Sequence, residues 1–372
     1  MRLETLAVHA GAEVDSSTGA IAPPIHLSTT FEHGPASEET HGFTYVREKN
    51  PTQTRLEEAL AKLEGGESAF VFSSGMAAGV AILQTLPPGS HVIFPDDMYA
   101  TFRQLYREFL PNWGLESSIV NMQKLEDLKR ALRPNTRLVW LETPSNPLMK
   151  ISDIEAVSEI AHASNATVVV DNTFATPLIQ RPITLSADVV LHSATKYLGG
   201  HSDVQGGALV LGKKSGLREK LLQIREVLGS VSSPFNSWLV LRGLRTLPCR
   251  VEKHSSNAAT VAEALVRNPA VERVFYPGLT SHPGHEIAKR QMRLFGGMMS
   301  FQVKGGRDRA VKVASNLKLF LNATSLGGTE SLVEHRASME GEYSTAPPNL
   351  LRLSVGLEHP DDLIEDLRQA LK

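Results

Sequence analysis

Residues 188–201 read Asp-Val-Val-Leu-His-Ser-Ala-Thr-Lys-Tyr-Leu-Gly-Gly-His. The first five form an apolar run that is typical of a buried strand. Lys196 follows the end of that run, where open α/β sheets bind their ligands. Ser193 and Thr195 offer hydroxyl groups to a phosphate, and the two glycines that follow allow the backbone to approach a ligand closely. Taken alone, the stretch is equally compatible with a surface lysine in a turn between a strand and a helix.

Similar runs occur on both sides of this stretch, and helix-like segments separate most of them. Because strands alternate with helices, the sequence predicts an α/β domain with a mostly parallel seven-stranded sheet. Runs with little alternation predict strands that are buried on both faces. The seven predicted strands are residues 69–72, 91–94, 117–120, 138–142, 167–171, 188–192 and 207–211.

The chain divides into three predicted parts that differ in composition. Residues 1–60 are rich in Pro and Gly breaks, which predicts an extended N-terminal arm lying on a neighbouring subunit. Residues 61–255 form the predicted large domain. Residues 256–372 form a smaller C-terminal α/β domain, which closes with a helix at 360–371 whose leucines lie on one face.

The composition excludes several classes of function and of site. The chain has 372 residues and a formal net charge of -2, so it lacks the basic field that recruits nucleic acid. A single cysteine, Cys249, rules out an internal disulfide and any cysteine-based zinc site, and it favours a reducing, cytoplasmic location. We expect no metal, no signal peptide and no membrane span, since no apolar run approaches about 18 residues.

Polar features follow four other predicted strands. Asp171 ends the strand 167–171, and a buried carboxylate there needs a cationic partner, such as a protonated pyridine nitrogen. Gly75 and Met76 open a helix whose N-terminus favours an anion. Tyr99 offers a ring for stacking, and Asn146 offers a donor. Each is individually more typical of a structural role, but together they predict a pocket for pyridoxal phosphate held by a covalent lysine.

These motifs are similar to those of the Cys/Met-metabolism, or transsulfuration, family of pyridoxal-phosphate-dependent enzymes, which includes cystathionine γ-synthases and γ-lyases. The resemblance covers nearly the whole chain and implies the type I fold of pyridoxal-phosphate-dependent transferases. The segment around Lys196 and the one that begins at Arg352 are the most specific. The motifs that carry the resemblance begin at Val8, Tyr45, Ser74, Asp171, Ser193, Gly199, Ser325 and Arg352.

The resemblance implies a role for each site residue. Lys196 would carry the cofactor covalently and move protons, Asp171 would pair with the ring nitrogen, and Tyr99 would stack on the ring. The phosphate would be held by Gly75, Met76, Ser193 and Thr195, together with Tyr45 and Arg47 from the neighbouring subunit. Arg352 would bind the substrate carboxylate with Asn146 and Ser325. Members of the family are usually homotetramers built from two dimers, with active sites shared within each dimer, so the resemblance implies the same assembly.

The implied reaction is γ-replacement or γ-elimination on cystathionine, methionine, homocysteine or an O-acyl-homoserine. The alternatives are a C–S β-lyase or an aminotransferase that uses the same cofactor, and a catalytically idle binding protein on the same fold. Two departures from the family pattern bear on the substrate. Ala100-Thr101 directly follows Tyr99, where the family usually has one residue more, and Thr324 stands where cystathionine-cleaving members tend to have Glu.

Overall fold

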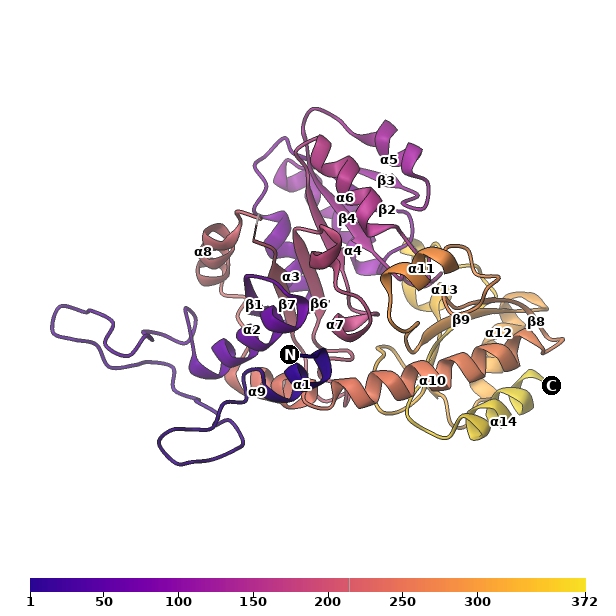
Figure 1. Ribbon diagram of the computed structural model, residues 1–372. Helices are drawn as coiled ribbons and strands as arrows, with labels where there is room; N and C mark the ends of the chain where they lie inside the picture. Colours follow the sequence, from indigo (N-terminus) through magenta and orange to yellow (C-terminus); the bar gives the residue numbers. More distant parts are fainter. Residues whose placement is uncertain (214) are drawn as a thin grey trace.

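A computed structural model describes residues 1–213 and 215–372. A seven-stranded sheet forms the centre of the large domain, in the order β1-β7-β6-β5-β4-β2-β3 (Figure 1). Only β7 runs against the other strands, so the predicted mostly parallel sheet is confirmed. The strands are β1 (Ser68–Phe72), β2 (His91–Pro95), β3 (Glu116–Val120), β4 (Thr136–Glu142), β5 (Thr167–Asp171), β6 (Val189–Ser193) and β7 (Gly207–Leu211).

Helices cover both faces of this sheet. Successive side chains along a strand point to opposite faces, and here both sets are apolar. In β5, Val169 packs towards α3, α4 and α8, whereas Val168 and Val170 pack towards α5 and α6. These helices are α3 (Gly75–Leu83), α4 (Ala100–Glu108), α5 (Leu125–Ala131), α6 (Ile154–Ala163) and α8 (Arg218–Leu228).

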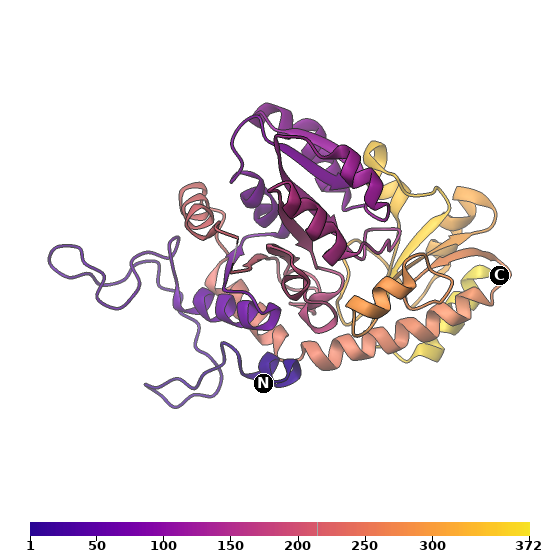
Figure 2. The same ribbon diagram turned by 45° about the horizontal axis from the view of Figure 1, so that its top comes forward.

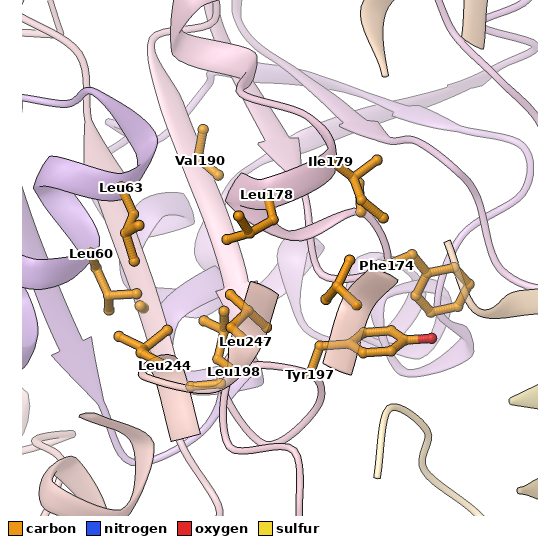
Figure 3. Close-up of a cluster of buried hydrophobic side chains, with 14 of the residues drawn as sticks. Leu60, Leu63, Phe174, Leu178, Ile179, Val190, Tyr197, Leu198, Leu244 and Leu247 are labelled. Atoms are coloured by element: carbon orange, nitrogen blue, oxygen red, sulfur yellow. The ribbon is translucent and has the colours of Figure 1, made fainter. Parts of the chain in front are cut away.

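A third apolar cluster joins the sheet to helices on the same face as α6 (Figure 3). There α2 places Leu60 and Leu63 against Val190 of β6, beside Leu178 of α7 and Leu244 of α9. The helices of this layer are α1 (Leu3–His9), α2 (Pro51–Glu64), α7 (Thr176–Ile179) and α9 (Pro234–Leu244). The cluster fixes α2 against the strands that lead to the Lys196 segment.

The second sheet has five strands in the order β10-β11-β12-β9-β8 and belongs to the C-terminal part of the chain. The long helix α10 (Leu247–Val266) runs from the large sheet to this smaller one (Figures 1 and 2). The remaining elements are β8 (Val271–Phe275), α11 (His285–Gln291), β9 (Met298–Val303), α12 (Gly306–Asn316), β10 (Leu321–Asn322), β11 (Leu332–His335), α13 (Arg336–Glu340), β12 (Leu350–Ser354) and α14 (Pro360–Leu371), with short 3-10 helices at Leu110–Trp113, Pro182–Leu185 and Gly341–Tyr343.

The N-terminal segment differs from the prediction of an extended arm over residues 1–60. Its two ends are helical, in α1 and α2, and their apolar residues belong to the core. Asn50 caps α2 by accepting from the Thr52 N–H, and Pro51 occupies the first helical turn, so the pair starts a helix rather than a loop. Between the two helices the chain forms loops that project from the body of the molecule (Figure 2).

Within the described parts of the chain, no helix is long and apolar enough to cross a lipid bilayer.

Candidate active site

One cavity of about 340 Å³ lies where the carboxyl ends of the large-sheet strands meet the smaller sheet. Ten of the residues predicted as site residues line it, and they come from strands of both sheets, from the start of α3 and from loops. They are Gly75, Met76, Tyr99, Asn146, Asp171, Ser193, Thr195, Lys196, Ser325 and Arg352.

The start of α3 forms one end of the cavity. Ser74 caps this helix by accepting from the Ala77 N–H at 3.1 Å, and the first N–H groups of a helix have no partner within it. Gly75 lies so close to β6 that a side chain there would meet the Cβ of Ser193 at 2.9 Å. Hydroxyl groups and helix N–H groups thus converge here, as an anionic group requires.

Asp171 and Glu142 are two buried carboxyl groups on neighbouring strand ends. Burial raises the pKa of Asp171. The hydrogen bond that its Oδ1 accepts from the Thr173 N–H at 3.0 Å acts in the opposite direction and lowers this pKa, but burial has the larger effect. Burial, and then the charge of Asp171, raise the pKa of Glu142 well above its ordinary value. Glu142 Oε2 accepts from the Tyr99 N–H at 2.9 Å, which fixes Tyr99 at the start of α4. A cation placed against Asp171 would relieve this accumulation of negative charge.

Lys196 lies in the turn after β6, and its ammonium donates to Ser325 Oγ at 2.7 Å. Burial, and then the nearby Arg352 guanidinium, lower the pKa of Lys196 to about 8. A larger fraction of this amine is therefore neutral near pH 7 than for an ordinary lysine, as a nucleophile or a proton acceptor requires.

Ser325 joins the lysine to the arginine of the site. Its φ is +86°, a left-handed conformation that is strained for a residue with a side chain. In this conformation its hydroxyl faces Lys196 while its carbonyl accepts from Arg352 Nη2 at 3.1 Å. Strained backbone of this kind is concentrated at functional sites.

Arg352 stands on β12 and is almost completely buried. Its Nη1 donates to Asn146 Oδ1 at 3.1 Å and its Nη2 to Glu334 Oε2 at 2.6 Å. These bonds hold the guanidinium in one orientation at the cavity, where a planar fork suits a carboxylate.

A chain of buried ion pairs lies behind Arg352 and was not predicted from the sequence. Glu334 also accepts from Arg336 at 2.5 Å, and Glu340 accepts from Arg336 at 2.5 Å and from Arg103 of α4 at 2.6 Å. Three arginines and two glutamates therefore connect the two sheets beside the cavity. No motif marks the whole chain of ion pairs: Glu334, Arg336 and Glu340 lie close together in the sequence, but Arg103 reaches them only through the fold.

Tyr45 and Arg47 are the two predicted site residues that lie away from this cavity. Both belong to the projecting loops, Tyr45 is 41% exposed, and Arg47 Nη1 donates to the Glu226 carbonyl at 2.8 Å. The Arg47 guanidinium also lies 5.3 Å from the centre of the Tyr45 ring.

Comparison with known proteins agrees with the family resemblance of the sequence motifs. The family model described as Cys/Met metabolism PLP-dependent enzyme matches residues 4–372. The chain is 48% identical to the cystathionine gamma-synthase of Mycobacterium tuberculosis, over 99% of this chain and 96% of that protein. It is 43% identical to the cystathionine gamma-lyase of Bacillus subtilis, with complete coverage of both chains. Proteins named cystathionine beta-lyase match at 43–44% identity.

The same fold is found in the crystal structure of a related protein. A crystal structure of metB from Corynebacterium glutamicum superposes with a TM-score of 0.97 at 43% sequence identity. The match covers all of this chain and 98% of the other.

Proposed function

Since the chain belongs to the Cys/Met-metabolism family of pyridoxal-phosphate-dependent enzymes, we propose that it catalyses γ-replacement on an activated homoserine, with a thiol amino acid as the second substrate. The observation that carries this proposal is the pair of contacts made by Ser325. They place a reactive amine, Lys196, next to a carboxylate-binding fork, Arg352, as a reaction at the α-carbon of an amino acid requires. The similarity to proteins named cystathionine gamma-synthase supports replacement at Cγ.

The cavity fits pyridoxal phosphate on observations of its own. The buried carboxyl of Asp171 has a raised pKa and faces the cavity, so it suits a protonated ring nitrogen. The helix start at Gly75 and Met76, with the hydroxyls of Ser193 and Thr195, suits the phosphate. Tyr99, 40% exposed at the cavity, offers its ring for stacking.

The cofactor supplies an electron sink for negative charge that develops at the substrate α-carbon. The chain supplies orientation and proton transfer. Arg352, held by Asn146 and Glu334, binds the α-carboxylate and so presents the Cα–H to Lys196. The Lys196 amine would accept the proton from Cα of the substrate and then the proton from Cβ.

Reaction at Cγ makes a specific isotope prediction. A γ-substituent can leave only after protons have been removed from both Cα and Cβ, whereas a β-substituent leaves after Cα alone. When O-acetyl-homoserine and cysteine react in heavy water, we expect cystathionine that carries deuterium at Cα and Cβ of the homoserine-derived half, as measured by mass spectrometry. Pyruvate as the main product from cystathionine, without exchange at Cβ, would show a β-lyase instead.

The homotetramer with shared active sites is part of the same proposal. The loops between α1 and α2 expose large apolar side chains, which favours a partner surface over solvent. These side chains are Val14, Ile21, Leu27 and Tyr45. Tyr45 and Arg47 lie away from their own cavity, which supports a role in the phosphate site of a neighbour. The single cysteine, Cys249, which is exposed and free, supports the proposed cytoplasmic location.

Subunit mixing tests this sharing. Arg47→Ala and Lys196→Ala homomers are each expected to be nearly inactive, because every site in them lacks one group. A mixed dimer contains one site with both groups, so mixing under conditions of subunit exchange should restore up to half of the wild-type activity per mixed dimer. Exchange demonstrated by mass spectrometry without any recovered activity would show that Arg47 does not act across the interface.

A further inference from the structure

Glu334 contacts the arginine that is proposed to bind the substrate carboxylate. It stands on β11 directly opposite Arg352 of β12, so both side chains lie on one face of the smaller sheet. Both residues line the cavity, although Glu334 is only 2% exposed and Arg352 only 4%. Glu334 Oε2 accepts from Arg352 Nη2 at 2.6 Å. A carboxylate of the protein therefore already occupies the group that a substrate carboxylate would use.

The hydrogens of Arg352 show what this contact excludes. A guanidinium can hold a carboxylate with two parallel bonds at either of two edges, and each edge uses one of the two hydrogens on Nη2. Nη2 has two acceptors here, Glu334 Oε2 at 2.6 Å and the Ser325 carbonyl at 3.1 Å. Both of its hydrogens are thus engaged. A substrate carboxylate can gain two parallel bonds only if one of these acceptors leaves.

Glu334 is the acceptor that can leave. The Ser325 carbonyl belongs to the backbone, and the hydroxyl of the same residue is bonded by Lys196. Glu334 Oε2 has a second partner, Nη1 of Arg336, at 2.5 Å, and Arg336 also lines the cavity. The other oxygen, Oε1, is buried and has no hydrogen-bond partner within residues 1–213 and 215–372. The carboxylate can therefore turn away from Arg352 and keep its ion pair with Arg336.

The charges of the buried ion pairs favour such an exchange. Three guanidinium groups share two carboxylates in this chain of contacts: Arg103, Arg336 and Arg352 with Glu334 and Glu340. One positive charge is left unmatched within it, and a substrate carboxylate would match that charge. While Glu334 stays on Arg352, however, its negative charge repels the incoming carboxylate.

We propose that Glu334 competes with the substrate for Arg352: its carboxylate occupies Nη2 while the site is empty, and it passes to Arg336 when a substrate carboxylate binds. The proposal rests on the proposed role of Arg352 in binding the substrate α-carboxylate. Glu334 lowers the affinity of the site for every anion. It also makes the site selective for carboxylates, because two parallel bonds offset the one that is displaced.

Binding of butyrate to the enzyme loaded with pyridoxal phosphate tests this competition. Butyrate has the carboxylate and carbon chain of the substrate but no amine, so it cannot react with the cofactor. Glu334→Gln keeps an oxygen that can accept from both arginines but removes the negative charge. We expect the dissociation constant of butyrate, measured by calorimetry in chloride-free buffer, to fall about tenfold, because a hydrogen bond to a charged group contributes about a factor of ten or more.

Glu330→Gln is the matched control. Glu330 precedes β11, bonds Ser202 and Thr329, and does not line the cavity, so the affinity for butyrate should stay at the wild-type value. An unchanged or higher dissociation constant in Glu334→Gln would overturn the proposal, because Glu334 would then only orient Arg352. The same fall in both variants would overturn it as well, since a general effect of charge would explain it.

Arg352→Gln tests the premise separately. Butyrate binding should be lost in this variant, and undiminished binding would refute the role of Arg352 itself rather than the competition.

Two crystal structures of the wild-type holoenzyme decide the question if Glu334→Gln does not fold. Without a ligand, Glu334 Oε2 should lie within hydrogen-bond distance of Arg352 Nη2, as it does here. With butyrate bound, the butyrate carboxylate should occupy Nη2 while Glu334 contacts Arg336 alone. A Glu334 carboxylate that still bonds Nη2 in the complex would contradict the exchange.

Discussion

Lys196→Ala is expected to lower kcat by about 10³-fold or more, since both covalent attachment of the cofactor and proton transfer at the substrate depend on this amine. The fold should persist, because the ammonium contributes one side-chain hydrogen bond, to Ser325, at the rim of a cavity. The cofactor should still bind through Asp171 and the start of α3. Turnover and cofactor content after gel filtration measure the two effects separately.

Lys150→Ala is a matched control for this variant. Lys150 is a partly buried lysine that pairs with Asp96 at 2.7 Å, and neither residue lines the cavity. Its removal should leave kcat within a few-fold of wild type. Turnover in Lys196→Ala above a tenth of the wild-type value would contradict the assignment of Lys196.

Asp171→Asn is expected to lower kcat by about 100-fold or more. The change is nearly isosteric, and the remaining oxygen can still accept from the Thr173 N–H, so stability should change little. What is lost is the negative charge that keeps the ring nitrogen protonated, and each pKa unit of that stabilisation is worth about 1.4 kcal/mol, or a factor of ten.

Steady-state kinetics and the absorbance spectrum of the bound cofactor measure this prediction. Asp188→Asn serves as its control, because Asp188 lies before β6, near the opposite end of the strand from the cavity, and binds His162 and the Val168 N–H. Near-normal turnover in Asp171→Asn would show that another group pairs with the ring.

The buried strands of the large sheet could be predicted from the sequence because each is a short apolar run between turn residues. Strand β5, for example, was predicted at residues 167–171, as observed. The strand β11 was missed, since Leu332–His335 ends in Glu-His and lacks the pattern of a buried strand. Its Glu334 is buried only because two arginines from other elements neutralise it, and that pairing is a property of the fold.

Those residues of the site that lie at or just after the end of a strand could be predicted from the sequence. Parallel strands have their carboxyl ends at the same edge of a sheet, so the sequence alone predicts that Asp171 and Lys196 lie close together. The ion pair between Arg103 and Glu340 was not predictable in this way, because it joins α4 to α13, which come together only in the folded chain. The helix α2 was not predicted, because its start at Asn50-Pro51 resembles a loop.

Reductive trapping tests the central claim most directly, namely that this cavity holds the cofactor on Lys196. The purified protein is loaded with pyridoxal phosphate, reduced with borohydride, digested and mapped by mass spectrometry. The account predicts one stoichiometric pyridoxyl label, on the peptide that contains Ser193–Tyr197, and its loss in Lys196→Ala. A stoichiometric label on any other lysine, or none on a protein that turns over substrate, would contradict it.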